Sequence, residues 1–160
     1  MEYCYNCGTK LELKHLVHEG MIPFCNKCNK FIFPIFNAAV SMIICDKDEK
    51  NILLIKQYST NFYRFVAGYI NKGESAEEAV YREILEEVGL KPIKIKPLKT
   101  SYYEKSNTLM YNYLAICDDI NVVTNYEIDE YKWFPIEEAK EALKDAKLAY
   151  EFFSYYINNR

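Results

Sequence analysis

Residues 68–90 read GYINKGESAEEAVYREILEEVGL and form the most informative segment of the chain. Ser75 is a favourable helix N-cap, and Glu78 three residues later completes a capping box. Gly89 stands where a glycine in the left-handed conformation commonly ends a helix. The segment therefore predicts a helix over 75–88, with a glycine-bearing loop at each end.

Three glutamates share one face of this predicted helix. At roughly 100° per residue, Glu86 and Glu87 both lie one turn beyond Glu83. Like charges in one stripe repel, but a hard divalent cation removes that penalty, and Mg²⁺ or Mn²⁺ prefers carboxylate oxygens. Arg82 can orient one carboxylate through a forked hydrogen bond. The alternative interpretation is an ordinary solvated acidic face.

The whole segment resembles the Nudix signature, G-x5-E-x7-R-E-U-x-E-E-x-G-U, where U is a bulky aliphatic residue. The specified positions are occupied here by Gly68, Glu74, Arg82, Glu83, Ile84, Glu86, Glu87, Gly89 and Leu90. The resemblance implies an α/β fold of the α+β kind, a Nudix α/β/α sandwich with a mixed β-sheet. It also implies a hydrolase that acts on phosphorus-containing acid anhydrides.

The same resemblance assigns roles to the residues of the segment. The carbonyl of Gly68 and the carboxylates of Glu83, Glu86 and Glu87 are expected to bind catalytic Mg²⁺ or Mn²⁺. Arg82 is expected to join these glutamates in catalysis, with Glu74 pairing to it as a structural support. The general base stays open among three acids, which are Glu87, Glu127 and Glu130.

The flanking sequence predicts strands and helices in a fixed order. Short apolar or aromatic runs bounded by polar turns indicate strands, and apolar residues at helical spacing indicate two helices near the C-terminus. The predicted order is β-β-β-α-β-β-β-α-α, with strands over 38–44, 52–57, 62–66, 92–99, 109–117 and 130–134, and late helices over 135–144 and 148–157.

Two cysteine pairs precede this region. Cys4 and Cys7 form one CxxC motif, Cys25 and Cys28 form another, and 17 residues separate the two motifs. Such twinned spacing is typical of a zinc ribbon, in which four thiolates hold one structural Zn²⁺ and leave no open position for water. The domains are therefore predicted as a zinc ribbon over 1–33 and a Nudix domain over 34–160. Paired disulfides or redox motifs are the competing interpretations.

The remaining cysteines and the histidines have plainer interpretations. Cys45 and Cys117 fall in apolar strand patterns and are expected to be small core residues. His15 and His18 lie between the two CxxC motifs and are spare ligand candidates, although surface positions are the expected outcome.

A zinc ribbon followed by a Nudix domain resembles the NADH pyrophosphatase group. Residues 31–34, FIFP, and 67–69, AGY, are similar to that group's entry into the first strand and to its A-G-F start of the signature. The group carries an S-Q-P-W-x-F-P-x-S array after the signature, whereas residues 100–107 read TSYYEKSN and keep only the serine. Tyr102 and Tyr103 within this stretch are candidate substrate-binding residues, because aromatic faces stack on nucleobases.

Charge and hydropathy restrict the partners. The net charge is −3, so the chain is not expected to coat nucleic acid, and capped RNA is the one nucleic acid foreseen, as a substrate. Residues 1–10 do not resemble a signal peptide, and the apolar stretch 31–45 is too short to span a bilayer. A cytoplasmic protein without a membrane partner is expected.

The leading functional hypothesis is a metal-dependent pyrophosphohydrolase that cleaves a small-molecule, nucleoside-diphosphate-linked substrate. The alternatives are an enzyme specific for NADH or for NAD caps on RNA, and a non-catalytic regulator that senses nucleotides. The aromatic stripe at the C-terminus is expected either to cover the sheet or to form a homodimer contact, with the dimer favoured; its residues are Leu148, Phe152, Phe153 and Tyr156.

Overall fold

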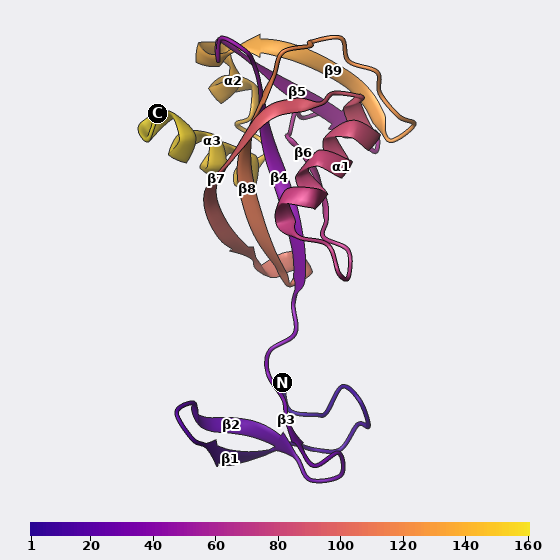
Figure 1. Ribbon diagram of the computed structural model, residues 1–160, viewed down its shortest axis with the longest axis vertical. Helices are drawn as coiled ribbons and strands as arrows, with labels where there is room; N and C mark the ends of the chain where they lie inside the picture. The colour runs from indigo at the N-terminus through magenta and orange to yellow at the C-terminus, as the bar shows by residue number, and fades with distance from the viewer. The chain divides into compact units, whose positions relative to one another are not determined.

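The computed structural model describes all residues, 1–160, and the chain divides into two compact units, Met1–Phe36 and Asn37–Arg160 (Figure 1). The first unit is a three-stranded antiparallel sheet in the order β1-β2-β3. Its strands are β1 (Glu12–Leu16), β2 (Gly20–Cys25) and β3 (Lys30–Phe31). Its buried core contains few residues, of which two are cysteines: Cys4, Cys25 and Ile32. So small a core cannot stabilise a unit of this size without a further crosslink.

The second unit has the order of elements predicted from the sequence, β-β-β-α-β-β-β-α-α, with one short 3-10 helix added. The elements are β4 (Asn37–Asp46), β5 (Asn51–Gln57), β6 (Val66–Tyr69), α1 (Ala76–Val88), β7 (Pro92–Tyr103), η1 (Glu104–Ser106), β8 (Thr108–Cys117), β9 (Ile128–Pro135), α2 (Ile136–Ala142) and α3 (Lys147–Asn158).

The strands form one mixed sheet in the order β7-β8-β4-β5-β9, and β6 pairs with β4 as well. The β4–β8 pair is parallel, whereas every other pair is antiparallel. Successive side chains of β4 point to opposite faces of the sheet, and both faces are buried. Its residues Val40, Met42 and Ile44 belong to one core, and Ala39, Ile43 and Cys45 belong to the other.

Helices cover both faces of this sheet, as Figure 1 shows, with α1 on one side and α2 and α3 on the other. The α1 core includes Ala79, Val80, Ile84 and Val88. The opposite core includes Ile136 and Ala139 of α2 and Phe152, Phe153 and Tyr156 of α3. The predicted α/β/α sandwich with a mixed sheet is therefore confirmed, preceded by a small sheet that carries four cysteines.

The caps of α1 form as the sequence predicts. Ser75 accepts from the backbone N–H of Glu78, and the Glu78 side chain accepts from the Ser75 backbone. Gly89 ends the helix in the left-handed conformation, with φ +70°. Burying an aliphatic side chain such as Ile84 contributes about 1.5–3 kcal/mol. The apolar face therefore fixes the helix on the sheet and, with it, the position of the glutamate stripe.

Two expectations were wrong in detail. The strand predicted over 62–66 begins only at Val66, because the preceding chain forms a loop in which Tyr58 and Ser59 both have φ near +55°. The C-terminal stripe covers the sheet instead of presenting a surface for a second copy, since Phe152, Phe153 and Tyr156 are buried.

Other expectations about single residues hold. Cys45 and Cys117 are fully buried in β4 and β8, as expected for core residues.

None of the helices is both long enough and apolar enough to cross a bilayer.

Candidate active site

The site is built where β6 passes α1, and its closest approach joins Gly68 to Glu83. A Cβ atom placed on Gly68 would lie 1.9 Å from Cδ and 2.0 Å from Oε1 of Glu83. No residue other than glycine fits here without displacing the carboxylate. Glu83 is only 9% exposed, so the strand backbone and the helix together fix its position.

Arg82 connects the loop before α1 to the glutamate stripe. Its Nε and Nη2 donate to the two oxygens of Glu74 at 2.6 and 2.9 Å, a bidentate pair. Its Nη1 donates to Oε1 of Glu83 at 2.6 Å and to Oε2 of Glu86 at 3.2 Å. These donors hold the pKa of Glu74 down at about 2, so this acid stays ionised and serves as the anchor of the arginine.

Glu87 has a different environment from its neighbours. It is 6% exposed, and its Oε2 atom is buried without any hydrogen-bond partner. Burial raises the pKa of Glu87 to about 8, and the nearby charges of Glu83, Glu127 and Glu86 contribute to this rise. Burial also raises the pKa of Glu83, against the opposing effect of Arg82. A buried carboxylate without a hydrogen-bond partner costs free energy of folding unless a ligand satisfies it.

The three predicted metal-binding carboxylates share one face of α1, but their oxygen atoms do not all converge within 4.8 Å. Arg82 draws Glu83 and Glu86 toward its guanidinium, and the Glu86 side chain is 57% exposed. The donor set nevertheless fits Mg²⁺ or Mn²⁺, because it offers hard carboxylate oxygens and includes one buried oxygen that nothing else satisfies.

The loop acids that sequence left open differ in their surroundings. Glu130 pairs with Lys56 at 2.6 Å and accepts from the Tyr63 hydroxyl, and these two donors lower its pKa. Glu127 accepts from the Tyr58 hydroxyl at 2.5 Å and lies near enough to Glu87 to raise that residue's pKa. Glu127 therefore lies near Glu87, whereas Glu130 is held by a lysine.

Tyr58 is a site residue that sequence reasoning missed. Nothing distinguishes it among 15 tyrosines in the sequence, and its contact with Glu127 depends on a loop that places two successive non-glycine residues at positive φ. The backbone N–H of Ser59 donates to Asp129 at 2.6 Å, which ties this loop to the start of β9. A conformation of this kind costs about 1–3 kcal/mol and persists only where the surroundings fix it.

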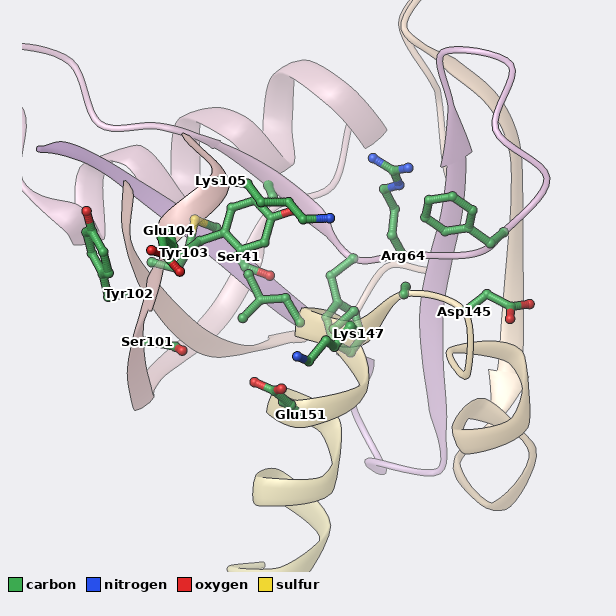
Figure 2. Close-up of a pocket in the computed structure, with 17 residues that line it drawn as sticks. Ser41, Arg64, Ser101, Tyr102, Tyr103, Glu104, Lys105, Asp145, Lys147 and Glu151 are labelled. Carbon is green, nitrogen blue, oxygen red and sulfur yellow. The ribbon is translucent and has the colours of Figure 1, made fainter. Parts of the chain in front are cut away.

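A cavity of about 690 Å³ opens beside Ala67, the residue that precedes Gly68 (Figure 2). Its walls come from the loop before β6, from the end of β7 with η1, and from the start of α3. Tyr102 and Tyr103, the predicted substrate-binding residues, both line it, and so do Phe62 and Arg64. The volume lies in the range of small-molecule binding sites.

The four cysteines of the first unit form a compact cluster. One sulfur atom from each of Cys4, Cys7, Cys25 and Cys28 lies within 4.8 Å of all the others, and all four thiols are free. His15 and His18 take no part in the cluster. The arrangement is consistent with the predicted zinc ribbon and does not form the competing disulfides.

These observations define a class of protein, and comparison with known families agrees. The profile of the NUDIX domain family matches residues 35–156, so the chain belongs to this family.

Its relatives include a Pseudomonas aeruginosa protein named NAD-capped RNA hydrolase NudC, 23% identical over 99% of this chain and 56% of the relative. Another is Nudix hydrolase 19, chloroplastic, from Arabidopsis thaliana, 29% identical over 91% of this chain and 35% of the relative. The chain thus spans only about half, or less, of the length of these curated relatives.

Solved structures share the fold. A NUDIX hydrolase from Nitrosomonas europaea superposes with a TM-score of 0.64 at 20% identity, covering 78% of this chain and 90% of that one. The NUDIX domain of Shewanella oneidensis NrtR, solved in complex with ADP ribose, has a TM-score of 0.58 at 18% identity over 74% of this chain and 82% of that one.

Proposed function

We propose that this chain is a Mg²⁺- or Mn²⁺-dependent pyrophosphohydrolase that cleaves the phosphoanhydride bond of a nucleoside-diphosphate-linked substrate. The observation that carries the proposal is the buried, unpartnered carboxylate oxygen of Glu87, next to Glu83 and Glu86 on the same helix face. A protein that used this helix only for packing would have no reason to leave such an oxygen unsatisfied.

The chain's own residues would act in two ways at the metal site. Glu83, Glu86, Glu87 and the Gly68 carbonyl would hold the metal, which when bound supplies Lewis-acid polarisation of the phosphoryl oxygens and lowers the pKa of water. Arg82, anchored by Glu74, donates to the carboxylates of Glu83 and Glu86 and would restrict their orientation.

Glu127 is proposed as the general base. Water attacks one phosphorus, the anhydride P–O bond breaks, and the other phosphate leaves with the bridging oxygen and its electron pair. A proton of the water passes to a carboxylate oxygen of Glu127. The Tyr58 hydroxyl donates to Oε2 of Glu127 and thereby orients the carboxylate. Glu130 is less suited to this role because Lys56 and Tyr63 occupy its two oxygens.

The cavity beside Ala67 is proposed to bind the nucleoside, with Tyr102 and Tyr103 as stacking surfaces. The relatives named NAD-capped RNA hydrolases, at 23–28% identity, support NADH or NAD-capped RNA as candidate substrates. The missing Gln-Pro-Trp array between Ser101 and Ser106 weighs against a strict NADH preference.

For the first unit we propose one structural Zn²⁺ held by the four cysteines. Four thiolates complete a tetrahedral site, so this metal would stabilise the small sheet and take no part in hydrolysis. Free thiols held for a metal suit the reducing cytoplasm, which is the proposed location.

The test is hydrolysis by purified protein with Mg²⁺ or Mn²⁺ against NADH, ADP-ribose, ADP-sugars, dinucleoside polyphosphates and NAD-capped RNA. Release of a nucleoside monophosphate from at least one is expected. Glu87→Gln should lower kcat by orders of magnitude, whereas Glu138→Gln, an exposed acid of α2, should not. An intact panel with both metals would favour the nucleotide-sensing regulator instead.

A further inference from the structure

Arg64 is a half-buried cation on the wall of the cavity beside Ala67 (Figure 2). Its backbone pairs with Ile55 through both the N–H and the C=O, so its position on the sheet is fixed. Its guanidinium carbon lies 4.5 Å from the centroid of the Phe62 ring, a cation–π contact. The backbone pairing and the ring contact together restrict the position of the Arg64 side chain.

The hydrogen-bonding capacity of this guanidinium is largely unused. Nε is buried and has no partner, and the contact from Nη2 to the Thr60 hydroxyl is long, at 3.4 Å. No carboxylate lies within ion-pair distance, whereas Arg82 has three. A half-buried arginine normally finds an acid, because an uncompensated buried charge is costly. Arg64 therefore has the donor geometry of a site for an anion that comes from outside the chain.

None of Glu83, Glu86 and Glu87 is among the charged groups that shift the pKa of Arg64. Burial lowers the pKa of Arg64, and the side chains that oppose this effect are the hydroxyls of Tyr58 and Tyr103, with no carboxylate among them. Even if fully extended, the four-residue step from Arg64 to Gly68 spans at most roughly 13 Å. The ribose of a bound nucleotide and the arginine side chain together can bridge a gap of this size.

The other charged residues of the cavity are exposed. Two lysines and three acids line it, and none of them forms an ion pair with Arg64 or with one another; they are Lys105, Lys147, Glu104, Asp145 and Glu151. Their charges nearly cancel, and water screens them. Arg64 is the one desolvated charge in the cavity, so it dominates the recognition of an anion there.

We propose that Arg64 is a specificity residue that binds a phosphate ester on the ribose of the nucleotide, outside the scissile diphosphate. A planar guanidinium with free edge donors suits a phosphate, which accepts two parallel hydrogen bonds. Two sources carry this chemistry: a ribose monophosphate, as in NADPH, and the first phosphodiester of NAD-capped RNA. The proposal deepens the proposed function and rests on it for its kinetic test.

The kinetic test compares kcat/KM for NADH, NADPH and a short NAD-capped RNA in the wild type, Arg64→Gln and Arg64→Lys. Charged hydrogen bonds of about 1.5–3 kcal/mol correspond to roughly 10- to 150-fold. Arg64→Gln should therefore lower kcat/KM by that factor more on a phosphate-bearing substrate than on NADH, which lacks the ester. Arg64→Lys should recover part of it. A loss confined to NADPH identifies the monophosphate as the source, and a loss confined to the RNA identifies the phosphodiester.

A binding test is independent of hydrolysis. Calorimetry without divalent metal would compare 5′-AMP with adenosine 2′,5′-bisphosphate and adenosine 3′,5′-bisphosphate. At least one bisphosphate should bind the wild type about tenfold or more tightly than AMP, and this advantage should vanish in Arg64→Gln but survive in Lys91→Ala, an exposed cation outside the cavity. Equal affinities in the wild type, or an equal loss on NADH, would overturn the role of Arg64. If no substrate is cleaved while the bisphosphate preference holds, the proposed function fails and this assignment stands.

Discussion

Gly68 and Glu83 share one small volume between β6 and α1, so the strand can approach the helix only because residue 68 has no side chain. A Cβ there would lie within 2.3 Å of three atoms of the Glu83 carboxyl group. Glycine is therefore required at position 68 because it leaves room for the Glu83 carboxylate. A left-handed backbone is not the reason, since the φ of Gly68 is not positive.

Gly68→Ala is therefore expected to push the Glu83 carboxylate out of place, lowering kcat by about tenfold or more and weakening Mg²⁺ binding. The matched control is Gly73→Ala, whose added Cβ meets nothing within 4 Å but whose φ of +89° makes it strained. The control should lose about 1–3 kcal/mol of stability and keep its kcat. Equal activity in Gly68→Ala and the wild type would mean that Glu83 tolerates displacement and is no metal ligand.

The two loop acids give a second prediction. Glu127→Gln should lower kcat by roughly 10²- to 10⁴-fold, the usual range for loss of a general base, with little change in KM. Tyr58→Phe should lower kcat less, because it removes only the hydrogen bond that orients Glu127. Glu130→Gln is the matched control and should change kcat by less than about threefold. Steady-state kinetics at saturating Mg²⁺ measures all three, and a larger loss in the control would move the base to Glu130.

Glu87 gives a prediction about pH. The folded protein holds its proton up to about pH 8, while in the unfolded chain the carboxyl ionises near its ordinary pKa of 4.5. Between pH 4.5 and 8 the folded protein therefore holds a proton on Glu87 that the unfolded chain releases. The contribution of Glu87 to the free energy of unfolding is fully present below pH 4.5 and is lost as the pH rises through 8. In urea without Mg²⁺, the wild type should lose stability relative to Glu87→Gln between about pH 5 and 8.

Saturating Mg²⁺ should reverse this loss at about pH 8 in the wild type, because the cation binds the ionised carboxylate. Glu87→Gln should gain little from the metal. The exposed Glu138→Gln change should behave as the wild type does in both conditions. A wild type and a Glu87→Gln variant with parallel pH profiles would show that Glu87 ionises normally in the folded protein.

Local signals in the sequence were sufficient for the helix that carries the site. Ser75, Glu78 and Gly89 determine where α1 begins and ends, and their effects operate within one or two helical turns. The strands were predicted from short apolar or aromatic runs bounded by polar turns, as in β4. These features could be predicted from the sequence because each depends on residues close together in the chain.

Features that depend on long-range contacts could not be predicted from the sequence. The Tyr58–Glu127 hydrogen bond joins residues 69 positions apart, and the strained loop before β6 displaced the start of that strand from the predicted residue 62 to Val66. The isolation of Arg64 could not be foreseen either, since the absence of an acid near it depends on every element that lines the cavity. The apolar spacing in α3 was compatible with packing on the sheet or with contact to a second copy. In the structure the apolar residues of α3 pack on the sheet.

The six cysteines give a final prediction, about metal removal. Four of them cluster within 4.8 Å, while Cys45 and Cys117 are fully buried in the sheet, where burial raises their pKa to about 12 and about 11. Thiolates react and thiols do not, so these two should resist alkylation near pH 8 in the folded protein. Purified protein should carry about one Zn²⁺ per chain, and a chelator should expose only the cluster to labelling. Mass spectrometry of alkylated peptides reports each site, and Cys4→Ser combined with Cys25→Ser should abolish the zinc. Labelling of Cys45 before the cluster would show that the sheet opens first and that the four thiols are held by something other than a removable metal.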